Sequence, residues 1–276
     1  MNDLQDKVAI LTGASRGLGA QIARALAAEG MRLVLAARSA DQLTRLADAL
    51  RAAGAEAEPV PGDVADSAVR ERLIARTTER FGRIDVLINN AGIELVGALS
   101  DVEDDEIDRL FAVNAVATAQ LSRAVLPHML MRRSGVIINM ASMAGKAAIP
   151  YNSVYSASKA AVIHLTLSLR DELVGTGVTA SVICPGFVTG TGMYEDMRSE
   201  SGLTAPALVG TVSDRRVVRT VLEAIRRGGP EYIVYRGPIR PLIALATLFP
   251  RMYSVFNSIT GLRAAYARAA QASKKG

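Results

Sequence analysis

Short runs of β-branched and other apolar residues alternate with stretches of helical periodicity along most of this chain, and this alternation restricts the fold more than any other feature. The strand-like runs are Lys7–Thr12, Arg32–Ala36, Ala57–Val60, Asp85–Asn89, Gly135–Met140, Val178–Cys184 and Tyr232–Tyr235. The helical stretches are Gly17–Glu29, Ala40–Ala53, Ser67–Phe81, Glu103–Arg132, Ser153–Leu173 and Asp214–Arg227. Strands separated by helices predict βαβ units and a parallel sheet. Several runs are apolar on both faces, which predicts helices on both sides of that sheet.

Two segments lie outside this alternation, and neither has the composition of a linker between domains. The segment 186–213 is rich in Gly, Thr and Ser and contains Pro206, which predicts a long, mobile substrate loop. The segment 236–276 is rich in Pro, Arg and apolar residues. We therefore expect one α/β domain over residues 1–235 and a helical C-terminal extension, 236–276, that belongs to the same domain.

A glycine-rich turn follows the first predicted strand. The sequence from Thr12 to Gly19 contains three glycines in the spacing Gly-x3-Gly-x-Gly, and helical periodicity begins directly after it. Glycines at a strand-to-helix turn let the backbone approach a pyrophosphate, and the helix N-terminus supplies N–H donors to it. The turn therefore predicts a dinucleotide site.

The end of the second predicted strand indicates which dinucleotide binds. NAD sites place an acidic residue there to hold the ribose 2′-hydroxyl, whereas this strand ends Ala36-Ala37-Arg38 with no acid. A carboxylate would repel a 2′-phosphate, and a guanidinium can bind one through two hydrogen bonds. Arg38, with Arg16 approaching from the glycine turn, therefore predicts NADP(H). Asp63, after the third strand, is expected to bond the adenine amino group.

Several further motifs, taken with the glycine turn, resemble those of the short-chain dehydrogenase/reductase family. They are Asn89-Asn90-Ala91-Gly92, Asn114, Ser142, the pair Tyr155-x3-Lys159, and Pro185-Gly186, in the family's order over residues 7–235. Ala141 stands where many members have a second serine. The resemblance implies a single Rossmann-type domain with a doubly wound, seven-stranded parallel sheet and helices on both faces.

The resemblance also implies an oxidoreductase that moves a hydride between NADP(H) and a carbonyl/alcohol pair. Tyr155 is the general acid/base, and Lys159, four residues later on the same helix face, is expected to lower the pKa of that phenol. Ser142 steadies the substrate oxygen, and Asn114 resembles the residue that holds a water in the proton relay. The catalytic set is therefore Asn114, Ser142, Tyr155 and Lys159.

The predicted cofactor residues lie at the ends of the strands. Lys159 is expected to bond the nicotinamide ribose, and Val188 and Thr189 the carboxamide. The whole set is Gly13, Ser15, Arg16, Gly17, Leu18, Gly19, Arg38, Asp63, Val64, Asn90, Ala91, Gly92, Tyr155, Lys159, Pro185, Gly186, Val188 and Thr189. We predict no metal site, because His128 and His164 are the only histidines and are far apart in the chain.

The C-terminal region carries most of the positive charge. From Asp214 onward there are twelve Arg or Lys residues against three acids, a net charge of +9, while the rest of the chain carries −4. The run 241–249 is apolar almost all round, and apolar residues from Met252 to Ile259 recur at helical spacing. One interpretation is a helix that covers the substrate cleft or a subunit partner. The other is an interfacial element that contacts an anionic membrane. Both favour a lipophilic substrate.

The sequence contains no nucleic-acid-binding motif, no signal-peptide pattern and no apolar run long enough to span a bilayer, and it has a single cysteine. We therefore expect a cytoplasmic protein, peripherally membrane-associated at most, that assembles as a homodimer or homotetramer and binds a small molecule. Two alternative functions stay open. One is a 3-oxoacyl thioester reductase in place of a lipid or sterol carbonyl reductase. The other is an NADPH-sensing regulator without turnover, which would not need the intact catalytic set.

Overall fold

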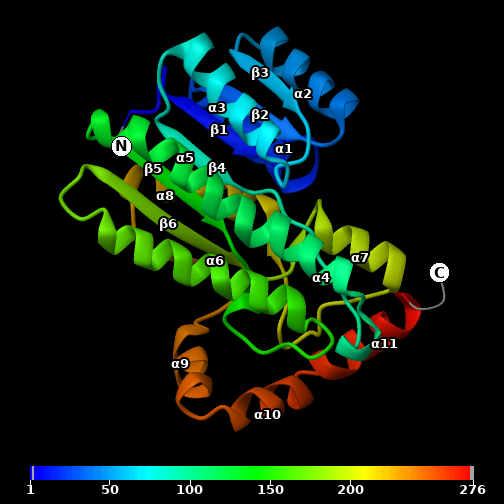
Figure 1. The fold of residues 1–276 in the computed structure, drawn as a ribbon. Helices are drawn as coiled ribbons and strands as arrows, with labels where there is room; N and C mark the ends of the chain where they lie inside the picture. The colour runs from blue at the N-terminus through cyan, green and yellow to red at the C-terminus, as the bar shows by residue number, and fades with distance from the viewer. Residues whose placement is uncertain (2, 274–276) are drawn as a thin grey trace.

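The computed structural model describes Met1 and residues 3–273 as a seven-stranded sheet enclosed by helices (Figure 1). The strand order is β3-β2-β1-β4-β5-β6-β9, and every pair is parallel. The strands are β1 (Val8–Thr12), β2 (Arg32–Ala37), β3 (Ala57–Pro61), β4 (Val86–Asn89), β5 (Gly135–Met140), β6 (Val178–Pro185) and β9 (Glu231–Val234). The predicted doubly wound parallel sheet is confirmed.

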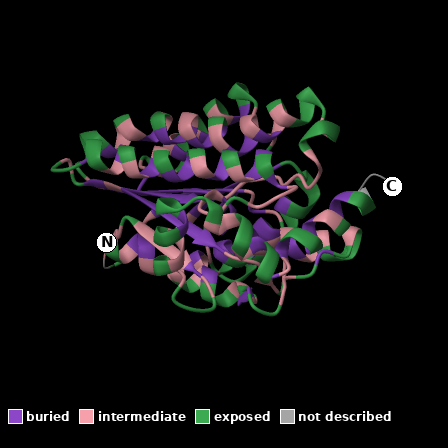
Figure 2. Ribbon diagram, turned by 90° about the horizontal axis from the view of Figure 1, so that it is seen from below, coloured by how far each residue is buried: buried purple, intermediate pink, exposed green. Residues whose placement is uncertain are grey.

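Helices cover both faces of the sheet, and Figure 2 shows the buried strands between the two helical layers. One face packs against α1 (Gly17–Ala28), α2 (Ala40–Ala52) and α8 (Asp214–Arg227); the other packs against α3 (Ser67–Phe81), α5 (Ala117–Met131) and α6 (Ser153–Glu172). Neighbouring residues of β1 illustrate the division. Ile10 packs in the core between the sheet and α3, α5 and α6, whereas Leu11 packs in the core between the sheet and α1, α2 and α8. Both side chains are fully buried. A strand buried on both sides is expected to be apolar along most of its length, and β1 is apolar from Val8 to Leu11.

The strand order reverses between β1 and β4, since β1 lies beside β2 on one side and beside β4 on the other. The chain therefore leaves the carboxyl ends of these two neighbouring strands toward opposite faces of the sheet. Such a reversal opens a crevice at the carboxyl edge, where ligands of doubly wound folds bind.

The helical stretch predicted over 103–132 is interrupted once. It begins with α4 (Asp104–Phe111), continues as a π-helical turn, η2 (Ala112–Val116), and ends with α5. Periodicity could not show this turn, because one wide turn of helix barely changes the spacing of apolar residues. Asn114 lies within it and is buried.

The segment 186–213 is more regular than the predicted mobile loop. It contains β7 (Val188–Thr189), α7 (Met193–Ser201) and β8 (Val212–Ser213), and the two strands pair in parallel. Gly202, with φ of +68°, ends α7 in the left-handed conformation. The buried side chains of Tyr194 and Leu203 attach the segment to the body.

The C-terminal extension is helical, as predicted, and consists of α9 (Arg240–Leu248), α10 (Arg251–Ile259) and α11 (Leu262–Ser273). The first two match the predicted amphipathic pieces, and α11 was not predicted. Tyr266 and Ala269 of α11 are buried against the segment 186–213. In Figure 1 the α9–α10 hairpin projects below the body while α11 returns toward α7. Within the described residues, no helix has the length and hydropathy to cross a bilayer.

Candidate active site

The glycine turn is held at the reversal point by hydrogen bonds between the ends of β1 and β4. Thr12 Oγ1 accepts from the backbone N–H groups of Asn90 and Ala91, each at 3.0 Å. Asn90 Nδ2 in turn donates to the carbonyls of Thr12 (3.0 Å) and Gly13 (3.2 Å). Asn90 is therefore used to fix the turn, so its side chain positions the dinucleotide site.

The turn has no room for side chains at two of its glycines. A Cβ at Gly19 would lie 2.0 Å from the carbonyl oxygen of Gly13, and a Cβ at Gly13 would lie 2.8 Å from the Cα of Ala91. Arg16 is the N-cap of α1, and no side chain caps the helix there. The first-turn N–H groups of α1 are thus left to an anion, which fits a dinucleotide pyrophosphate.

One pocket collects most of the predicted cofactor residues. The lining residues from that set are Gly13, Ser15, Arg16, Gly17, Leu18, Gly19, Arg38, Asp63, Val64, Asn90, Ala91, Gly92, Tyr155, Lys159, Pro185, Gly186 and Val188. Thr189 does not line it, and its hydroxyl donates to the carbonyl of Val212 at 3.3 Å. The carboxyl ends of five strands therefore meet around one cavity.

The charged residues at the ribose and adenine end are partly engaged with one another. Arg38 is exposed, whereas Arg16 forms an ion pair at 2.6 Å with Asp196 of α7. The Asp63 carboxylate accepts from the Ala65 N–H at 2.9 Å and pairs with Arg109. Partial burial would raise the pKa of Asp63, but the Ala65 amide and Arg109 outweigh it and lower that pKa. Asp196 and Arg109 were not foreseen, because neither is near its partner in sequence.

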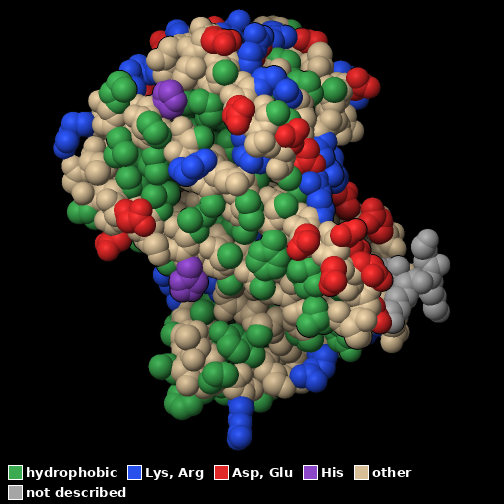
Figure 3. Space-filling model, viewed as in Figure 1, with side chains coloured by type: hydrophobic (Ala, Val, Ile, Leu, Met, Phe, Trp, Pro, Cys, Tyr) green, Lys and Arg blue, Asp and Glu red, His purple; other side chains and the backbone are tan. Residues whose placement is uncertain are grey.

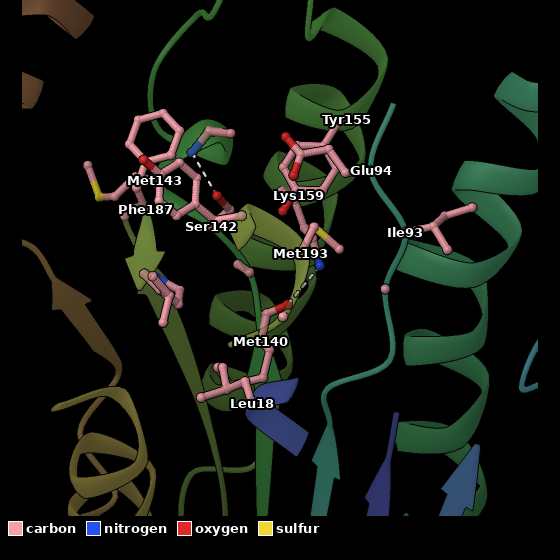
Figure 4. Close-up of a pocket in the computed structure, with 18 of the residues that line it drawn as sticks. Leu18, Ile93, Glu94, Met140, Ser142, Met143, Tyr155, Lys159, Phe187 and Met193 are labelled. Carbon is pink, nitrogen blue, oxygen red and sulfur yellow. Dashed lines mark hydrogen bonds between the residues drawn. The ribbon is translucent and has the colours of Figure 1, made fainter. Parts of the chain in front are cut away.

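Tyr155, Lys159 and Ser142 meet at the other end of the pocket, as Figure 4 shows. Tyr155 and Lys159 come from the first turns of α6, and each is buried. Lys159 Nζ donates to the carbonyl of Met140 at 3.0 Å and lies 5.7 Å from the centre of the Tyr155 ring. Ser142 Oγ accepts from the Ala144 N–H at 3.1 Å. Three of the four predicted catalytic residues therefore line one site.

Asn114, the fourth, does not line the pocket. Its Oδ1 accepts from the Ile93 N–H, and its Nδ2 donates to the Ile93 carbonyl, both at 2.9 Å. Nδ2 also donates to Ser158 Oγ at 3.0 Å. The side chain thus fixes the segment after β4 against α6, so we assign it a positioning role.

The pKa of Tyr155 is raised in this structure, and the lowering expected from Lys159 stays a prediction. Burial raises the pKa of the Tyr155 phenol, the charge of Glu94 raises it further, and a hydrogen bond with Ser142 opposes the change. Burial also lowers the pKa of the Lys159 ammonium to about 8, against the opposing charge of Glu94. Removing charged groups from water disfavours both the phenolate and the ammonium.

Glu94 is an active-site residue that the sequence prediction missed. It lines the pocket beside Tyr155 and Lys159 (Figure 4), and its Oε1 accepts from Asn152 Nδ2 at 3.1 Å. Burial raises the pKa of the Glu94 carboxyl to about 7, while the Asn152 amide and Lys159 act in the opposite direction. Its position two residues after the Asn-Asn-Ala-Gly motif was the available signal.

The rest of this end is apolar, and the C-terminal extension supplies much of it. Met143, Phe187 and Met193 line the pocket from the body. The extension contributes Ile239, Leu242, Ile243, Ala246, Tyr253, Phe256, Leu262 and Tyr266. The extension therefore borders the cleft, and whether it also contacts a membrane or a subunit stays a prediction. Among the described residues, no group of three or more His, Cys, Asp or Glu side chains is arranged to hold a metal ion.

These features define a Rossmann-type nucleotide-binding fold with a Tyr–Lys–Ser site. The sequence profile of the short chain dehydrogenase family matches residues 7–202. The chain therefore belongs to the short-chain dehydrogenase/reductase family and is an oxidoreductase.

Relatives of known name and structure agree. The ketoacyl reductase HetN of Nostoc sp. is 45% identical over 239 residues, which cover 87% of this chain and 82% of that protein. A Burkholderia phymatum short-chain dehydrogenase/reductase in complex with NAD superimposes with a TM-score of 0.81 at 30% identity, covering 91% of this chain and 96% of that one. An actinorhodin polyketide ketoreductase variant with NADPH gives a TM-score of 0.78 at 32% identity, covering 85% and 98%.

The raised pKa of Glu94 has a consequence for stability that can be measured. A carboxyl with a folded pKa of about 7, above its ordinary 4.5, holds its proton longer in the folded state. Its favourable contribution is therefore complete below about pH 4.5 and is lost as the pH rises through about 7. Relative to Glu94→Gln, we expect the wild-type free energy of unfolding to fall over this interval in urea titrations. The same change at exposed Glu172 should give a curve parallel to wild type. If the free energies of unfolding of wild type and Glu94→Gln run parallel against pH, the raised pKa of Glu94 is contradicted.

Proposed function

We propose that this protein is an NADP(H)-dependent reductase that converts a lipophilic ketone into a secondary alcohol. The observation that carries the proposal is a single pocket that joins the glycine turn of β1 to Tyr155, Ser142 and Lys159 and continues into an apolar chamber. A nicotinamide bound in this pocket would supply the hydride. The residues of the chain would bind the substrate, exclude water and deliver the proton.

Tyr155 is the proposed proton donor to the substrate oxygen, and Ser142 the hydrogen-bond partner that steadies this oxygen. Burial and Glu94 raise the pKa of Tyr155, which keeps the phenol protonated at neutral pH. A protonated phenol is the form that reduction of a carbonyl requires. Lys159 would return a proton to Tyr155 and is the proposed partner of the nicotinamide ribose, and Asn114 would position the segment after β4 beside them.

The apolar chamber favours a hydrocarbon-rich substrate, a lipid, sterol or acyl chain, because burying apolar surface is worth about 25 cal/mol per Å². A 3-oxoacyl thioester is the second candidate, and the 45% identity to a protein named ketoacyl reductase supports it. The assembly as a homodimer or homotetramer and the cytoplasmic location stay predictions.

Tyr155→Phe tests the reaction. The substitution removes the proton donor and keeps the ring, so turnover of any ketone reduced by wild type should fall by about 10²-fold or more. NADPH binding, followed by the fluorescence of the nucleotide, should persist. Near-normal turnover in this variant would overturn the assignment of Tyr155, and absence of turnover in wild type across a ketone panel would favour an NADPH-sensing role.

Arg38 tests the cofactor preference. We expect NADPH to bind more tightly than NADH, because a charge-assisted contact with the 2′-phosphate is worth about 1.5–3 kcal/mol, roughly ten- to a hundredfold in affinity. The pair Ala37→Asp with Arg38→Leu should reverse the preference. Arg45→Leu, on the exposed face of α2, is the control and should leave it unchanged. Tighter NADH binding by wild type would refute the proposal.

The α9–α10 hairpin is proposed to contact anionic membrane. Its inner face lines the pocket, while Leu245, Leu248, Phe249, Val255 and Ile259 are exposed on its outer side. Figure 3 shows apolar side chains gathered over this hairpin with Lys or Arg side chains among them. Residues 232–276 contain seven Arg or Lys and no acid. Burial of apolar side chains together with attraction to anionic headgroups is the basis of interfacial binding.

Flotation with phosphatidylserine-containing vesicles tests this contact. Wild type should float at low salt, less at high salt, and Leu248→Ser with Phe249→Ser should reduce flotation several-fold. These exposed positions are better targets than a deletion, which would remove the buried residues of α11. Val174→Ser, a side chain 76% exposed elsewhere, is the control. If wild type ignores the vesicles and the double variant turns a dimer into a monomer, the hairpin is a subunit contact instead.

A further inference from the structure

Glu94 is the one acidic residue, among the described residues that line the pocket, at its reacting end. The other acid that lines the pocket, Asp63, lies at the adenosine end and is paired with Arg109. Glu94 Oε1 accepts one hydrogen bond, from Asn152. Its second oxygen has no hydrogen bond to any residue that the structure describes. Glu94 is partly exposed and lines the pocket, so this oxygen is open to a ligand that carries a hydrogen-bond donor.

The backbone on both sides of Glu94 is fixed. Asn114 bonds both backbone groups of Ile93, and Asn152 Nδ2 donates to the carbonyl of Leu95 at 3.0 Å as well as to Glu94 itself. Asn152 is 1% exposed, and its own Oδ1 has no hydrogen-bond partner among the described residues. Two buried asparagines therefore hold Glu94 in place, as a binding group requires.

The charge of Glu94 raises the pKa of three titratable groups. Tyr155 and Lys159 come from α6, and Tyr266 comes from α11 in the C-terminal extension. Tyr266 is 3% exposed and lines the same pocket. The extension thus brings a hydroxyl to the chamber that Glu94 lines.

We propose that Glu94 is a specificity-determining residue, whose carboxylate accepts a hydrogen bond from a neutral donor group, a hydroxyl or an amide N–H, carried by the substrate near its reacting carbonyl. This inference rests on the ketone reduction proposed above. A pure hydrocarbon would leave Glu94 Oε2 without a partner, and an anionic group would be repelled by the carboxylate. A substrate ammonium group would be repelled by the ammonium of Lys159, which lines the same pocket. A neutral donor on an otherwise apolar substrate satisfies all of these constraints.

Matched ketones test this assignment. A medium-chain ketone is compared with analogues that carry a hydroxyl or a secondary amide at the first, second or third carbon from the carbonyl. Wild type should show a kcat/KM at least about tenfold higher for one donor-bearing analogue than for the parent ketone, since a site built to pair a donor rejects the analogue that lacks it. In Glu94→Leu this ratio should fall to about one.

Two further variants separate specificity from folding. Glu94→Gln offers an amide that still pairs with a hydroxyl, so it should keep part of the hydroxyl preference. Glu172→Gln removes an exposed carboxylate and should keep the wild-type ratios. The ratio compares two substrates on one protein, so a loss of folded enzyme does not change it.

Thermal stabilisation of the protein by the alcohol products, in the presence of NADP⁺, measures the same preference without turnover. The donor-bearing alcohols should stabilise wild type more than the parent alcohol, and Glu94→Leu should abolish the difference. Equal ratios and equal stabilisation in wild type and Glu94→Leu would overturn the role of Glu94 while leaving the reductase itself intact. Failure of the proposed reaction would instead abolish turnover of every ketone.

Discussion

The hydrogen bonds between Thr12 and Asn90 are the constraint on which the site depends. They join the ends of β1 and β4, the two strands between which the sheet order reverses, and they fix the glycine turn beside the first residues after β4. The segment 91–95 starts from this junction and is then held by Asn114 and Asn152. The dinucleotide end and the reacting end of the pocket are therefore positioned by three asparagine side chains, Asn90, Asn114 and Asn152.

Desolvation sets the chemistry of the reacting end. The C-terminal helices enclose a chamber that already contains Tyr155, Lys159 and Glu94, and burial is the largest cause of the pKa change in all three. Burial favours the neutral form of each group. Tyr155 stays a phenol, whereas a pKa of about 7 leaves Glu94 partly ionised as the carboxylate at neutral pH. The extension therefore acts on the reaction electrostatically as well as by shaping the pocket.

Much of the fold could be predicted from the sequence, because strands buried on both faces and helices buried on one leave periodic patterns. The apolar run 86–88 predicts a buried strand and the glycine spacing at 13–19 predicts a tight turn. Both depend on neighbouring residues alone, and the structure has both. The remaining features depend on contacts between distant residues. The Arg16–Asp196 pair joins segments 180 residues apart, and Glu94 meets Tyr266 only because α11 folds back over the pocket. The π-helical turn at Asn114 was invisible because it shifts periodicity by a single residue.

The distribution of buried polar groups separates structural from functional demands. Asp85 is fully buried, yet it accepts from the Val8 N–H and from two nitrogens of Arg83. Asn89 and Asn139 are bonded to each other at 2.8 Å within the sheet. Glu94 is only partly exposed, accepts one hydrogen bond and has a raised pKa. Stability alone does not require a carboxyl there, since a charged group with few partners away from water is costly. A polar residue that does not help stability but lies in a pocket is expected to serve ligand binding. The same reasoning does not apply to Asp85, because Val8 and Arg83 already donate hydrogen bonds to both of its carboxylate oxygens.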